Sequence, residues 1–64
     1  MIKYCVLFDN LDIRFRIYCY TYKDAKKCFF DLVNKNFEND LVMIYLLDDH
    51  DHIIAYFRKG TLEV

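Results

Sequence analysis

The sequence predicts an α+β fold: a small antiparallel β-sheet with one α-helix packed on one face, in the order β-β-α-β-β. Three patterns predict it: strict apolar and polar alternation over residues 13–20, apolar side chains at helical spacing over 22–34, and two apolar runs between 41 and 58 separated by a polar loop. With 64 residues the chain forms a single domain, 1–64.

The first two strands are predicted at residues 1–8 and 13–20, joined by a turn whose Asp and Asn side chains bond the nearby backbone. A loop of residues 9–12 predicts three cross-strand pairs, all on one apolar face: Phe8 with Ile13, Val6 with Phe15, and Tyr4 with Ile17. The opposite face then carries these side chains: Lys3, Cys5, Leu7, Arg14, Arg16, Tyr18 and Tyr20.

A helix is expected from about Tyr22 to Asn34, because Thr21 can cap its first turn and Asp24 places a carboxylate near the positive end of its dipole. Its apolar stripe comprises Ala25, Cys28, Phe29, Leu32 and Val33. The helix should end near Asn36, since asparagine tolerates the left-handed conformation of a C-terminal cap.

The second hairpin is predicted from residues 41–47 and 53–58, with Leu47 opposite Ile53. Regular alternation then gives one face of Met43, Tyr45, Leu47, Ile53, Ala55 and Phe57. The other face has Val42, Ile44, Leu46, Ile54, Tyr56 and Arg58. Both faces are largely apolar, and residues 61–64 form either a short edge strand or a tail.

A single helix of this length can cover one face of the sheet and leaves the other uncovered. An exposed face with aromatic, apolar and arginine side chains is typical of a binding surface. The predicted partner-binding residues on it are Lys3, Arg14, Arg16, Tyr18, Tyr20, Tyr56 and Arg58.

A dense acidic loop, Asp48-Asp49-His50-Asp51-His52, joins the last two predicted strands. We include Asp48, Asp49 and Asp51 among the partner-binding residues, because their carboxylates could face a basic partner and speed the encounter. Two other interpretations remain open: a solvated turn that discourages edge pairing, and a metal site built on His50 and His52. We expect neither a metal nor another cofactor.

The composition weighs against common enzyme classes. The chain has no serine and one glycine, which excludes the usual serine nucleophile and glycine-rich phosphate loops. Cys28 could act as a nucleophile with a loop histidine as base, but its place on the apolar stripe favours packing. The prediction is therefore a protein that is not an enzyme.

Three cysteines without a C-x-x-C spacing favour reduced thiols and a cytoplasmic location. The start of the chain lacks the pattern of a signal peptide, and the longest apolar run is far shorter than the roughly 20 residues of a membrane-spanning helix. We expect no membrane association.

The function expected from these observations is a small protein-binding module, able also to form a homodimer through its sheet. In size and composition the chain resembles products of AT-rich phages and mobile elements, among which anti-CRISPR proteins, antitoxins and other inhibitors are common. That analogy implies a viral inhibitor that sterically blocks a larger partner, such as a nucleic-acid-processing host complex. The alternative is a regulator that binds single-stranded RNA or DNA through the arginine and tyrosine face. A third interpretation is that cross-strand pairs of arginine and tyrosine only cover the sheet and bind nothing.

Overall fold

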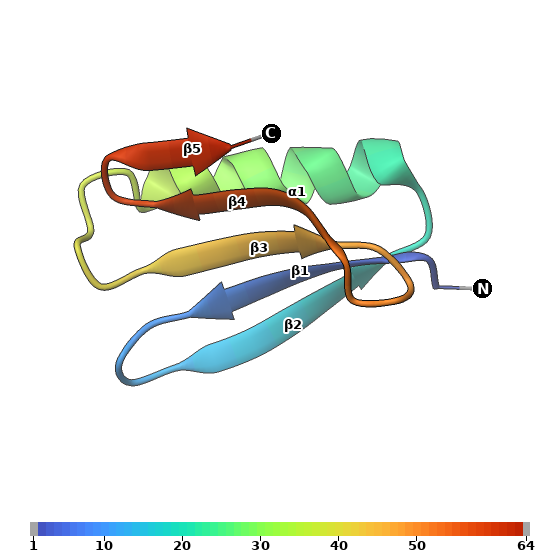
Figure 1. Cartoon of the computed structure of the whole chain (residues 1–64), viewed down its shortest axis with the longest axis horizontal. Coiled ribbons are helices and arrows are strands. Elements are labelled where there is room, and N and C mark those ends of the chain that lie inside the picture. The colour runs from blue at the N-terminus through green and yellow to red at the C-terminus, as the bar shows by residue number, and fades with distance from the viewer. Residues whose placement is uncertain (1, 64) are drawn as a thin grey trace.

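The computed structural model describes residues 2–63 and has one helix on one side of a five-stranded antiparallel sheet (Figure 1). The expected order is confirmed, and the segment left open as a strand or a tail is a fifth strand. Met1 and Val64, which belonged to the first predicted strand and to that last segment, lie outside the described residues. The elements are β1 (Tyr4–Asp9), β2 (Arg14–Cys19), α1 (Tyr22–Lys35), β3 (Met43–Leu47), β4 (Ile53–Arg58) and β5 (Thr61–Glu63).

The strands lie in the order β2-β1-β3-β4-β5, so that β2 and β5 form the two edges. The helix packs on β1, β2 and β3. Its apolar stripe contributes Ala25, Phe29 and Val33 to the core, while Cys28 and Leu32 of the predicted stripe are partly buried against it. The largest fully buried side chains are Phe29, Phe57, Ile44, Leu46, Val6 and Val42. Burying each of them stabilises the fold by roughly 1.5–3 kcal/mol.

The β1–β2 register differs from the predicted one by two residues. The Asn10 side chain accepts hydrogen bonds from the backbone N–H groups of Asp12 (2.8 Å) and Ile13 (2.7 Å), which makes residues 10–13 the loop. The observed pairs are therefore Tyr4 with Cys19, Val6 with Ile17, and Phe8 with Phe15. A shift of two residues keeps every side chain on its predicted face.

Both ends of α1 lie where they were predicted, but the conformation of the C-terminal cap differs from the predicted one. The Thr21 hydroxyl accepts a hydrogen bond from the backbone N–H of Asp24 at 3.1 Å. Asn36 ends the helix with φ −121°, so the expected left-handed cap is wrong. Its side-chain amide donates to the Leu32 carbonyl at 2.8 Å, which also accepts the Asn36 backbone N–H at 3.1 Å.

A β-bulge in β4 overturns the predicted faces of the second hairpin. Leu47 pairs with Ile53 as expected, but Leu46 pairs with Ala55, so Ile54 is an extra residue without a partner. One extra residue reverses the alternation that follows it. Ala55 and Phe57 therefore join Ile44 and Leu46 in the core. Tyr56 and Arg58, which alternate with them along β4, lie on the opposite side of the sheet. The two faces differ in polarity far more than regular alternation predicts.

Candidate functional site: the open face of the sheet

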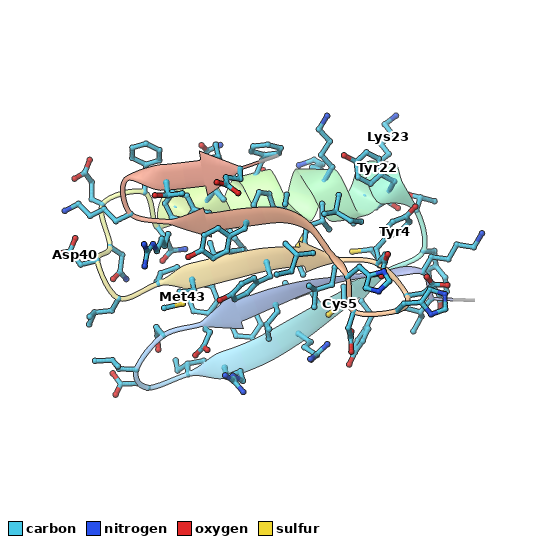
Figure 2. The ribbon with its side chains drawn as sticks, in the orientation of Figure 1. Tyr4, Cys5, Tyr22, Lys23, Asp40 and Met43 are labelled. Carbon is cyan, nitrogen blue, oxygen red and sulfur yellow. The ribbon has the colours of Figure 1, made fainter. Side chains whose placement is uncertain are left out.

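The side of the sheet that points away from α1 is the candidate site, and we call it the open face. Cross-strand pairing arranges its side chains in three rows across the sheet. The first row is Arg14, Asp9, Met43, Arg58 and Thr61; the middle row is Arg16, Leu7, Tyr45, Tyr56 and Glu63; the third row is Tyr18, Cys5, Leu47 and Ile53. Met43 on β3 and Cys5 on β1 mark opposite ends of this face in Figure 2.

The centre of the open face is aromatic. Tyr45 and Tyr56 are cross-strand partners, with ring centroids 5.2 Å apart and ring planes inclined by 43°. The Tyr45 hydroxyl donates to the Met43 sulfur at 3.4 Å. Both tyrosines and the neighbouring Leu7 are half-buried, so they present rigid apolar area together with a polar hydroxyl.

Two arginines of β2 are held in place by acidic partners. Arg14 contacts Asp9 at 2.9 Å, and Arg16 contacts Asp51 at 3.5 Å. The Arg16 guanidinium also donates to the Cys5 sulfur at 3.7 Å. Cys5 first and Asp51 second raise the pKa of Arg16. These pairs are exposed, so they orient the side chains more than they stabilise the fold.

The acidic loop between β3 and β4 is closed by its own first residue. The Asp48 carboxylate accepts hydrogen bonds from the backbone N–H groups of His50 (2.8 Å) and His52 (2.9 Å). The bond from His52 is the largest cause that lowers the pKa of Asp48, and the bond from His50 adds to it. Asp51 takes a left-handed conformation with φ 61°, which turns the chain back toward β4.

This loop covers one end of the open face. Cys5 and Leu47 point away from the helix, yet they are only 4% and 5% exposed. The loop passes in front of β1 in Figure 1, and Asp51 reaches Arg16 on β2. A small hollow of about 120 Å³ remains there, lined in part by Cys5, Arg16, Tyr18 and Asp51. The acidic loop and the arginine and tyrosine face, predicted separately, thus form one continuous surface.

The histidines of the loop pair with aspartates beside them. His52 Nδ1 lies 3.4 Å from the Asp48 carboxylate, and His50 Nε2 lies 3.7 Å from that of Asp49. Within residues 2–63, no three His, Cys, Asp or Glu side chains are grouped as metal ligands. The geometry of the loop is that of a hydrogen-bonded turn.

Of the ten predicted site residues, five lie on the open face, three aspartates lie in the acidic loop that covers one of its ends, and two lie beyond it. Arg14, Arg16, Tyr18, Tyr56 and Arg58 are members of its rows. Lys3 precedes β1 and donates its backbone N–H to the Cys19 carbonyl at 3.3 Å, and Tyr20 follows β2 as an exposed residue.

The sequence interpretation did not include Met43 and Tyr45 among the site residues, because regular alternation placed them on the face opposite Tyr56 and Arg58. The sequence did contain one indication: Tyr45 is the only side chain of β3 with a hydroxyl, and a hydroxyl favours the solvent-exposed side of a sheet.

The cysteines are suited to packing. All three are free thiols. Burial raises the pKa of the Cys28 and Cys19 thiols, which keeps them protonated and lowers their reactivity as nucleophiles.

Searches with protein-family models, curated proteins and solved structures return no match to this chain. The single helix found in the described part of the chain is too short and too polar to cross a membrane.

Proposed function

We propose that this protein is a protein-binding module that docks on its partner through the open face. The observation that carries the proposal is the row of Leu7, Tyr45 and Tyr56, half-buried on a sheet face that α1 does not cover. Tyrosine, arginine and methionine are the side chains enriched at the centres of protein interfaces. On the open face they lie side by side, with charged residues at the margins.

The charges of this face favour a protein partner over a nucleic acid. Arg14 and Arg16 each contact a carboxylate, and Glu63 ends the middle row beside Tyr56. A phosphate backbone would have to displace or approach these carboxylates, and the formal net charge of the chain is −1. A protein surface with an apolar centre and charges of both signs matches the face better.

Such a module acts by occupying a surface of its partner. We therefore propose steric inhibition of a larger complex, of the kind that viral anti-CRISPR proteins and antitoxins exert. The three free thiols suit action in a reducing cytoplasm.

The test is affinity capture from host lysate with tagged chain, followed by mass spectrometry and a binding titration of the captured partner. The double variant Tyr45→Ala with Tyr56→Ala should weaken that complex at least about 30-fold, since loss of one interface hot spot costs roughly 2 kcal/mol or more. Tyr20→Ala is the matched control, because it removes an exposed tyrosine that lies off the face. Retention of the same partner by the double variant would refute the proposal.

A second arm tests the nucleic-acid alternative with a labelled single-stranded 20-nucleotide DNA or RNA and fluorescence anisotropy. We expect no binding at physiological salt. Micromolar binding that weakens steeply with salt and is lost in Arg14→Ala with Arg16→Ala would favour the nucleic-acid function instead.

A further inference from the structure

The geometry points to a second surface, the free edge of β2, which borders the open face: we propose that β2 pairs with β2 of a second copy of this chain, forming a continuous ten-stranded sheet. This inference does not depend on the proposed function. β2 is a six-residue edge strand without a bulge, and every residue from Arg14 to Tyr18 is exposed or partly exposed. The other edge, β5, offers three residues.

The backbone of β2 shows which groups are free to pair. Asn10 donates its N–H to the Ile13 carbonyl at 2.9 Å, and Lys3 donates to the Cys19 carbonyl at 3.3 Å. Odd-numbered residues of β2 therefore turn their backbone groups toward β1. Even-numbered residues, Arg14, Arg16 and Tyr18, turn theirs to the free edge.

Side chains then select one register. Residues that lie opposite each other in an antiparallel pair point to the same face of the sheet. The two-fold axis that relates the two β2 strands therefore passes through a residue and not between two residues. An axis at Arg16 would oppose the two copies of Arg16, and an axis at Phe15 would oppose Arg14 to Arg16. An axis at Tyr18 avoids both like-charge contacts but pairs only residues 17–19 of the two strands, whereas an axis at Ile17 avoids them and pairs residues 15–19. It sets Arg16 against Tyr18 of the second copy, where the guanidinium can lie over the ring.

The helix side of this edge has matching shape and charge. A hollow of about 340 Å³ lies between β2 and α1, with Ile17, Cys28 and Leu32 as its apolar lining. Its charged rim alternates in sign along the helix: Asp24, Lys27, Asp31 and Lys35.

A two-fold axis at Ile17 places both helices on the same side of the joined sheet, running in opposite directions. Asp24 then lies toward Lys35 of the second copy. Lys27, which pairs with Asp31 of its own helix at 3.0 Å, lies toward Asp31 of the second copy. Each negative side chain meets a positive one, so the rim is complementary to itself in this orientation. That charge complementarity is why the occupant is a second copy of this chain.

The experiment is sedimentation equilibrium of the full chain from about 10 to 500 µM at low salt, with circular dichroism to verify folding. We expect a dimer with twice the monomer mass of 7.9 kDa. A strict monomer over this range overturns the proposal.

Two substitutions test the strand pairing. Tyr18→Pro removes a backbone N–H that faces the free edge and leaves the ladder to β1 intact, so it should raise the dimer Kd more than about tenfold. Tyr18→Ala keeps that N–H and should weaken the dimer less. An unchanged Kd in folded Tyr18→Pro would overturn the pairing.

The helix rim is tested by reversal of charge. Asp31→Lys opposes like charges across the axis and should raise the Kd about fivefold, and adding Lys27→Asp should restore it. Failure of the double variant to restore the dimer would overturn the two-fold arrangement. The variant Tyr45→Ala with Tyr56→Ala should remain dimeric, which separates this surface from the open face.

Discussion

The two faces of one sheet differ in kind, although the same strands build both. Tyr56 and Phe57 are neighbours in β4, yet Phe57 is 1% exposed in the core while Tyr56 is half-buried on the open face. The helix-covered face contains close-packed apolar side chains, and the open face combines tyrosines, arginines and carboxylates. The comparison teaches that strand alternation lets one set of strands build two different faces: one supplies the buried core, and the other stays partly exposed to solvent.

The largest expected effect is on the core side of this comparison. Phe57→Ala should lower the free energy of unfolding by about 3–5 kcal/mol, because it leaves a cavity where the ring packs 5.8 Å from Phe37. That loss is comparable to the whole stability of a small domain. Urea unfolding followed by circular dichroism measures it, and Phe57→Leu provides a milder variant that stays folded.

Tyr56→Ala is the matched control one residue away. Its ring is partly solvated, so we expect a loss smaller than that of Phe57→Ala by at least about 2 kcal/mol. Equal losses at the two positions would contradict the division between the faces.

A smaller effect measures how far the tyrosines of the open face support each other. Tyr45 and Tyr56, 5.2 Å apart, should show a coupling free energy of about 0.5–1 kcal/mol in a double-mutant cycle of Tyr45→Ala and Tyr56→Ala. The measurement is the urea-unfolding free energy of the four proteins. Strict additivity would mean that the rings are independent and that the open face is less ordered than the structure shows.

The smallest effect concerns the loop that covers one end of the open face, and it depends on pH. The pKa of Asp48 is lowered in the folded chain from its ordinary value of 3.8. Its carboxylate therefore contributes stability that is fully present above about pH 3.8 and is lost as the pH falls through the folded pKa.

Thermal unfolding of the wild type and of Asp48→Asn between pH 2 and 6 measures this contribution. The wild type should be more stable than Asp48→Asn at pH 6, and this difference should shrink as the pH falls through the folded pKa of Asp48. A difference that stays constant over the whole range would show that the charge of Asp48 has no part in closing the loop.

The fold class and most of the site followed from local patterns in the sequence, and the failures have a common cause. Thr21 and the stripe around Phe29 predicted α1 because capping and 3.6-residue periodicity are local properties. The bulge at Ile54 was not predictable in this way, since Ile53, Ile54 and Ala55 are all apolar and no polar side chain fixes the phase of the strand.

The β1–β2 register failed for a similar reason. Asp9, Asn10 and Asp12 can all bond a turn through their side chains, and only the structure shows that Asn10 does so. Alternation is unambiguous for Arg14, Arg16 and Tyr18, and these side chains lie on the face where it places them, whereas Tyr45 stands in an apolar run and was not included among the site residues.

Because of the bulge, β4 has one residue more than its pairing with β3 requires, and the strand can therefore lose a residue. Deleting Ile54 would join Ile53 directly to Ala55, and the strand would become regular with every later side chain on its present face. Deleting Tyr56 instead would turn Phe57 toward water unless the irregularity migrated along the strand. Because residues 53 and 54 are both isoleucine, deleting either gives the same chain, and simple straightening of the backbone accommodates that loss.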